Sequence, residues 1–133
     1  MQQPSILLVD DDEEDYFIIK EALADLHASQ VLQYATGGEK ALSLLERQYK
    51  EMHSLPRLIL LDLNMQVIDG LATLRLLKSD PRFREIPVLI YSTTIHPHVE
   101  EECMQLGAYG CIQKPCSLED ILRVGESLLA FCK

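Results

Sequence analysis

The sequence contains no tryptophan, few aromatic residues and no long run of apolar residues. Aromatic residues make up 6% of its 133 residues. No apolar stretch approaches the roughly 20 residues that a membrane-spanning helix needs. The first residues, Met1-Gln2-Gln3-Pro4, lack the basic and then apolar segments of a secretory signal peptide. We therefore expect a soluble cytoplasmic protein.

Basic residues are also in the minority. The chain has 12 Lys and Arg against 21 Asp and Glu, which gives a formal net charge of -9. Nucleic acids and anionic membranes would repel such a protein, so neither is an expected partner. The acidity is compatible with a metal cation or with a basic protein surface.

The four cysteines lack the spacing of a disulfide framework or a zinc site. No CxxC pair occurs among Cys103, Cys111, Cys116 and Cys132. In a reducing compartment we predict free thiols, several of them buried. A glycine-rich phosphate loop is absent, and the order of residues indicates no Ser/His/Asp or Cys/His catalytic set.

What the sequence does contain is an alternation of short apolar runs and amphipathic segments. Strands are predicted at residues 5–9, 31–35, 58–61, 88–91 and 110–113, each followed by apolar residues at helical spacing. Apolar runs without alternation are typical of strands buried on both faces of a parallel sheet. We predict one α/β domain over residues 1–133, a doubly wound (βα)5 fold without an output domain. Its expected strand order is the flavodoxin-like 2-1-3-4-5.

Local signals place some helix ends and faces. The acidic stretch Asp12-Glu13-Glu14-Asp15 suits a helix amino terminus, and Ser117 with Asp120 resembles a capping box. The second helix is predicted to turn Ala41, Leu42, Leu45 and Tyr49 toward the core.

Polar residues follow four of the predicted strands. They are Asp10, Asp11 and Asp12 after the first strand, Asp62 after the third, Ser92 after the fourth and Lys114 after the fifth. Parallel strands end at one edge of the sheet, where open α/β proteins bind ligands, so these side chains are expected to meet. Asp12 and the acids beyond it are interpreted as a solvated helix start. The four histidines are expected away from this edge.

The chemistry that such a set can perform is phosphoryl transfer to a carboxylate. Carboxylates about 5 Å apart repel by roughly 1 to 3 kcal/mol unless a cation or a proton offsets them. An all-oxygen site suits Mg²⁺, and Mn²⁺ can take its place. Asp62 is then the nucleophile, and Asp11 and Asp62 hold the metal with help from Asp10. Lys114 and the Ser92 hydroxyl are predicted to bind phosphoryl oxygens.

These residues resemble the receiver domain of two-component response regulators, specifically a stand-alone CheY-like one. The motifs are Val9-Asp10-Asp11, Asp62-Leu63-Asn64-Met65 with Asp69-Gly70, Ser92-Thr93 and Lys114-Pro115. The resemblance implies that Asp62 accepts phosphate from a histidine kinase or a phosphotransfer protein, and that the Asn64 main-chain carbonyl is a further metal ligand. It also implies a downstream protein target, a monomer or a phosphorylation-dependent dimer, and a cis Lys114–Pro115 peptide.

The sequence departs from this family at three positions. Gln66 stands in place of the usual proline, and Cys116 stands where an aromatic or aliphatic residue is common. Cys111 occupies the place of the aromatic residue that usually follows the switch hydroxyl inward. A thiol is too small for that movement, so we expect altered coupling to the surface formed by the fourth helix, fifth strand and fifth helix.

Two other functions stay open. An aspartyl-nucleophile phosphohydrolase typically has a second Asp two residues after the nucleophile, where this chain has Asn64. A phosphorylation-independent interaction module with this fold is conceivable because of Cys111. A flavodoxin-like cofactor binder is a poorer fit, since no ring-stacking loop is evident. We expect a phosphoacceptor that assists its own phosphorylation and dephosphorylation without being an enzyme.

Overall fold

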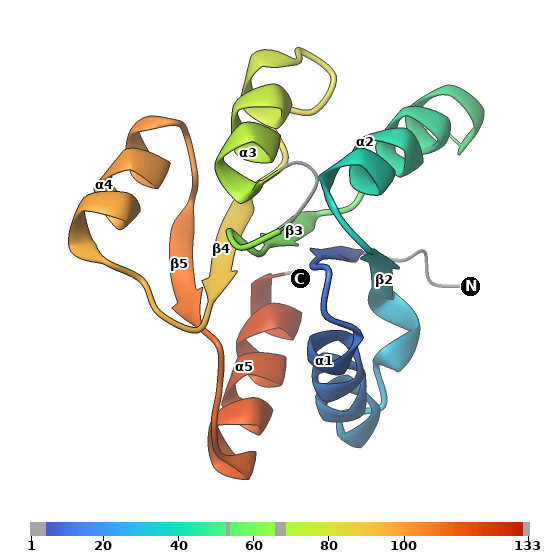
Figure 1. Cartoon of the computed structure of the whole chain (residues 1–133). Coiled ribbons are helices and arrows are strands. Elements are labelled where there is room, and N and C mark those ends of the chain that lie inside the picture. Colours follow the sequence, from blue (N-terminus) through green and yellow to red (C-terminus); the bar gives the residue numbers. More distant parts are fainter. Residues whose placement is uncertain (1–4, 53, 66–68, 132–133) are drawn as a thin grey trace.

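Strands and helices alternate along the chain in a computed structural model that describes residues 5–52, 54–65 and 69–131 (Figure 1). The strands are β1 (Ile6–Val9), β2 (Leu32–Ala35), β3 (Leu58–Leu61), β4 (Val88–Ser92) and β5 (Gly110–Gln113). The helices are α1 (Glu13–Asp25), α2 (Gly38–Arg47), α3 (Gly70–Ser79), α4 (Pro97–Gln105) and α5 (Leu118–Phe131).

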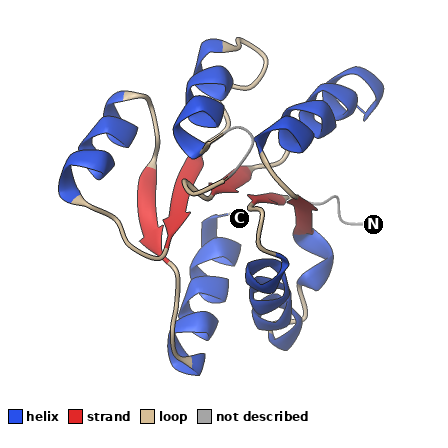
Figure 2. Cartoon of the chain, in the orientation of Figure 1, coloured by secondary structure: helices blue, strands red, loops and turns tan. Residues whose placement is uncertain are grey.

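The five strands form one parallel sheet in the order β2-β1-β3-β4-β5. Helices α1 and α5 cover one face, and α2, α3 and α4 cover the other (Figures 1 and 2). The predicted doubly wound, flavodoxin-like fold is confirmed. Because β1 and β3 are neighbours, with Val9 opposite Leu61, the residues that follow them leave the sheet side by side.

The central strands are buried on both faces. In β1, Leu7 and Val9 pack into the core beneath α2, α3 and α4, whereas Ile6 and Leu8 pack into the core beneath α1 and α5. This division follows from the pleat, which points successive side chains to opposite faces. It explains why the strand sequence is continuously apolar instead of alternating.

Side-chain caps fix several helix starts. The Asp12 carboxylate accepts a hydrogen bond from the Glu14 N–H at 2.9 Å, so the acidic stretch begins α1 as predicted. The Ser117 hydroxyl accepts one from the Asp120 N–H at 3.1 Å, which confirms the predicted cap of the last helix. Asp69 caps α3 by accepting from the Ala72 N–H at 2.7 Å.

One predicted helix face is wrong beyond its first turns. Ala41 and Leu45 are buried as expected, but Tyr49 is 44% exposed and Gln48 is buried instead. The reason is that α2 ends at Arg47 and continues as a π-helical turn over Gln48–Met52. Hydrogen bonds to the fifth residue along widen that turn and shift which side chain faces the core.

No cis peptide bond occurs in the described part of the chain. The Lys114–Pro115 peptide is therefore trans, and the expectation of a cis bond is wrong. Trans is the ordinary state of such a bond, favoured by about 0.5–1 kcal/mol. Gln66 lies outside the described residues. Of the helices that the structure describes, none is both long and apolar enough to cross a bilayer.

The three cysteines within the described ranges are free thiols, as predicted. Cys132 lies outside the described residues, and of the other three only Cys103 is buried, so the expectation of several buried thiols is met at one described position. Cys111 is half-buried because it lies on the edge strand β5, and Cys116 is exposed in the connection to α5.

Candidate functional site

The backbone ladder places two acids next to each other at the carboxyl edge of the sheet. The Asp10 N–H donates to the Ala35 carbonyl at 3.2 Å, and the Asp62 N–H donates to the Val9 carbonyl at 2.9 Å. These bonds extend the β1–β2 and β1–β3 pairings past the strand ends. Asp10 and Asp62 are therefore held rigidly, and both are buried.

Hydrogen bonds within the loops orient the two carboxylates. The Asp12 N–H donates to Asp10 Oδ1 at 2.9 Å, and the Asn64 N–H donates to Asp62 Oδ1 at 3.3 Å. Each acid thus keeps a second oxygen for another partner. Asp10 Oδ2 is buried and receives no well-directed hydrogen bond, although the Lys114 ammonium lies 3.1 Å away.

Three carboxylates meet closely enough to bind one cation. Single oxygens of Asp10, Asp11 and Asp62 all lie within 4.8 Å of one another, and Asp11 is the exposed member. Such an oxygen-only set, open to water on one side, fits Mg²⁺ because this ion keeps several waters and uses few carboxylates. The sequence prediction that these acids come together is correct.

Lys114 enters the same cluster from the end of β5. Its N–H donates to the Ser92 carbonyl at 2.8 Å, which holds the lysine backbone against β4. Its ammonium nitrogen lies 2.6 Å from Asp15 Oδ2, 3.1 Å from Asp10 Oδ2 and 3.6 Å from Asp62 Oδ1. Lys114 therefore lies where the sequence placed it, within reach of Asp62.

The pKa values of Lys114 and Asp10 reflect both burial and the neighbouring acids of the cluster. Burial would lower the pKa of Lys114, but the hydrogen bond to Asp15 and the charges of Asp10 and Asp62 outweigh it and raise the pKa. Burial is also the largest cause that raises the pKa of Asp10 to about 7, with further increases from Asp15 and Asp62. A divalent cation would relieve this crowding of acids.

Ser92 lies at the edge but is engaged with its own loop. It is buried, and its hydroxyl donates to the Thr94 carbonyl at 3.2 Å. Beside it is a cavity of about 370 Å³, whose walls include Asn64, Ser92, Thr94 and His96.

Two residues lie at this edge without having been predicted there from the sequence. Asp15 was interpreted as part of a solvated helix start, yet it makes the shortest contact to Lys114. Its position in the first turn of α1 keeps it near the same sheet edge, but the residue pattern alone does not distinguish a contact with Lys114 from a solvated acid at a helix start. His96 was expected elsewhere but lines the cavity beside Ser92, since it precedes α4 at the same sheet edge.

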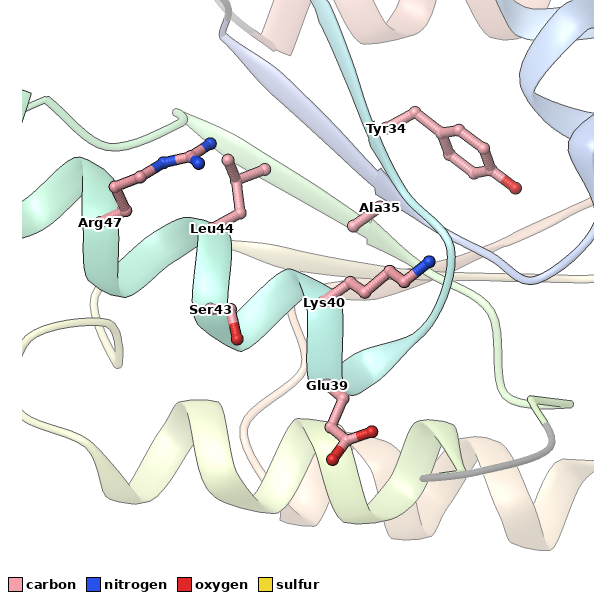
Figure 3. A pocket seen from close by; sticks show the side chains of 7 residues that line it. All are labelled: Tyr34, Ala35, Glu39, Lys40, Ser43, Leu44 and Arg47. Atoms are coloured by element: carbon pink, nitrogen blue, oxygen red, sulfur yellow. The ribbon is translucent and has the colours of Figure 1, made fainter.

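A hollow of about 460 Å³ lies apart from this cluster, along β2 and α2. Figure 3 shows Glu39, Lys40, Ser43 and Arg47 following one another along α2 beside it. The acids and the lysine at the carboxyl edge do not line this hollow. Its walls are a mixed charged surface, so the acidic cluster is the better candidate site.

Comparison with known proteins identifies the class of protein. The profile of the response regulator receiver domain matches residues 6–125, and the chain belongs to that family. It is 30% identical over 123 residues to the probable methanogenesis regulatory protein FilR2 of Methanothrix harundinacea, covering 92% of this chain and 79% of FilR2. It is 29% identical to the response regulator Rcp1 of Synechocystis, covering 95% of this chain and 86% of Rcp1.

Solved structures of response regulators also resemble this chain. The phosphorylated cyanobacterial phytochrome response regulator RcpA superposes with a TM-score of 0.84 at 30% identity, covering 98% of this chain and 94% of RcpA. The Mn²⁺-bound form of Rcp1 gives a TM-score of 0.80 at 28% identity, covering 96% and 93%. The chain is thus a CheY-like receiver of two-component signal transduction, with the phosphoacceptor role of that family.

Some relatives are longer proteins. The chain covers 55% of the response regulator GacA of Pseudomonas aeruginosa and 32% of a protein-glutamate methylesterase of Methanosarcina mazei. Where such relatives are enzymes, the activity belongs to their other domains, and the family itself consists mostly of signalling modules.

Proposed function

We propose that Asp62 is the residue that accepts the phosphoryl group. The observation that carries this proposal is the contact geometry around it: a buried carboxylate on β3 has an ammonium at 3.6 Å and two further acids within metal-binding distance. A cation held by these acids and the Lys114 ammonium would together offset the charge of Asp62, so that this carboxylate can meet an anionic phosphoryl donor.

We propose that a divalent ion binds beside Asp62. Asp10, Asp11 and Asp62 would hold Mg²⁺ or Mn²⁺ through their carboxylates, together with the Asn64 main-chain carbonyl. The oxygen-only donor set supports this assignment, and so does the Mn²⁺-bound form of Rcp1. When bound, the ion neutralises charge on the phosphoryl oxygens.

The remaining residues assist the transfer. The phosphoryl donor is a phosphohistidine of the partner protein. One Asp62 oxygen attacks its phosphorus as the bond from phosphorus to the histidine nitrogen breaks, and the departing imidazole takes a proton. Lys114 presents a positive charge to one phosphoryl oxygen. Ser92 donates its hydroxyl to another once its bond to the Thr94 carbonyl is released, which draws the β4–α4 loop toward the site.

The partners follow from this chemistry. The donor is a histidine kinase or a phosphotransfer protein, and the target is a protein whose affinity depends on the state of the β4–α4 loop, with the receiver acting as a monomer or as a phosphorylation-dependent dimer. The chain acts as a switch and not as an enzyme for a separate substrate. Free thiols at Cys103, Cys111 and Cys116 favour the reducing cytoplasm as its compartment.

The proposal is tested with beryllofluoride, a stable mimic of a phosphoryl group on a carboxylate. The parent protein is expected to bind it only with Mg²⁺ present, and Asp62→Asn should bind none. Glu13→Gln is a matched control, because Glu13 is an exposed acid near the same edge and should leave binding unchanged. Equal binding by Asp62→Asn would move the acceptor to another residue, and no binding by the parent would favour a phosphorylation-independent module.

A further inference from the structure

We propose that Asp15 is a positioning residue, which holds the Lys114 ammonium so that one of its N–H groups faces Asp62. Asp15 belongs to the first turn of α1 and lies outside the group of acids that could share a cation. This inference rests on the proposed function of Asp62 and extends it to a residue outside the receiver motifs in the sequence.

Lys114 is surrounded by acids from three elements. Asp10 follows β1, Asp15 belongs to α1 and Asp62 follows β3, and the ammonium lies 3.1, 2.6 and 3.6 Å from their carboxylates. The side chains of Lys114 and Asp15 are only 13% and 15% exposed, so water screens their contact weakly. The contact to Asp15 is the only one of the three to reach the length of a strong charge-assisted hydrogen bond with good geometry.

An ammonium group has three N–H donors on a flexible four-carbon stem. Asp15 accepts one of them, and Asp10 attracts the ammonium from 3.1 Å without a well-directed hydrogen bond, which leaves a further N–H to face Asp62. An incoming phosphoryl group then meets a donor that is already oriented, and the rotamer entropy of the lysine has been lost in advance. Without Asp15, the ammonium would be held by Asp10 alone and could swing away from Asp62.

Asp15 acts through the lysine and not through the metal. Among the described residues, the group that could share one cation consists of Asp10, Asp11 and Asp62 and does not include Asp15. Asp15 also joins two parts of the fold, because α1 packs beside α5 and Lys114 lies in the connection that leads to α5 (Figure 1). Its contact therefore fixes the lysine relative to the sheet from the α1 side.

The test compares Mg²⁺-dependent beryllofluoride binding by the parent, Asp15→Ala, Asp15→Asn and the control Glu14→Gln. Glu14 is exposed in the same helical turn and carries the same charge. We expect Asp15→Ala to weaken binding by about tenfold, the effect of losing a hydrogen bond to a charged group, and Asp15→Asn by less because its amide oxygen still accepts. Binding is measured at saturating Mg²⁺, because both Asp15 variants remove one negative charge near Asp10 and should weaken Mg²⁺ binding to a similar extent.

A purely electrostatic role for Asp15 predicts the opposite change in beryllofluoride affinity. If Asp15 served only as a negative charge near the site, both Asp15 variants would bind the anionic mimic more tightly, and such a result would overturn the inference. Equal losses for Asp15→Asn, Asp15→Ala and Glu14→Gln would overturn it too.

A double-mutant cycle tests the route through the lysine. In a Lys114→Ala background, Asp15→Ala should cause no further loss of beryllofluoride affinity, whereas additive losses would contradict a shared path. If Lys114→Ala does not fold, the relative beryllofluoride affinities of Asp15→Asn and Asp15→Ala test the positioning role instead. A parent protein that fails to bind beryllofluoride contradicts the proposed function, while Asp15 variants that bind like the parent contradict only this inference.

Discussion

Gly70 is the position at which a single methyl group should disturb the acceptor most directly. It is the first residue of α3, and its N–H donates to the Leu63 carbonyl at 3.1 Å. A Cβ atom added there would overlap the Asp62 carbonyl oxygen and the Leu63 Cα, closer than such atoms approach in proteins. Both are backbone atoms, so the chain that carries Asp62 would have to move.

The magnitude of a Gly70→Ala change follows from two opposing effects. Overpacking costs about 1–3 kcal/mol, and the upper end applies because backbone and not a flexible side chain is displaced. Alanine regains up to about 1 kcal/mol in a helix, so the expected net loss is about 2 kcal/mol. For a domain of this size that lowers the melting temperature by roughly 5 to 10 °C.

Thermal unfolding and beryllofluoride binding together measure this effect. A shift of Asp62 by a fraction of an ångström should weaken beryllofluoride binding by about 10- to 100-fold. Gly110→Ala is the matched control, because the nearest atom to its added Cβ is Leu89 Cδ2 at 3.4 Å, an ordinary contact, and stability should change by less than about 0.5 kcal/mol. A Gly70→Ala protein that melts and binds like the parent would refute the reasoning.

Three further predictions concern charge. Lys114→Ala should tighten Mg²⁺ binding by roughly 3- to 10-fold in a calorimetric titration, because the ammonium lies close to two of the proposed ligands; weaker binding would contradict this. Mg²⁺ at ten times its dissociation constant should raise the melting temperature by roughly 5 °C, corresponding to about 1.4 kcal/mol, and Asp11→Asn should reduce that shift. The hydrogen bond from Arg82 lowers the pKa of Asp80 below 3.8, so its stabilisation is present above about pH 4 and is lost as pH falls. Arg82→Leu should therefore lower the melting temperature near neutral pH but not near pH 2; an equal loss at both would contradict it.

The sequence determines the fold and most of the acidic cluster through simple periodicity. Strands buried on both faces must be continuously apolar, and the residues that follow such parallel strands must meet at one edge. For this reason Asp10, Asp11, Asp62 and Lys114 could be placed together before any coordinates were known. The predicted Asn64 ligand and the roles of Asp62, Ser92 and Lys114 stay predictions for the experiments above.

What could not be predicted depends on small shifts in backbone geometry. The π-helical turn after Arg47 buries Gln48 and leaves Tyr49 exposed. No pattern in the sequence marks where a helix widens in this way. Asp15 was overlooked because an acid in the first turn of a helix is already explained by capping and the helix dipole. Only the orientation of α1 against the β5–α5 connection distinguishes that ordinary role from a contact with Lys114.

The most direct test of the account is to find which residue carries phosphate. The parent protein is incubated with acetyl phosphate and Mg²⁺, reduced with borohydride, which converts an aspartyl phosphate to homoserine, and digested for peptide mass spectrometry. We predict homoserine at position 62 alone, and none when Mg²⁺ is removed by a chelator. Homoserine at Asp10 or Asp11, or labelling that persists without the metal, would contradict the account.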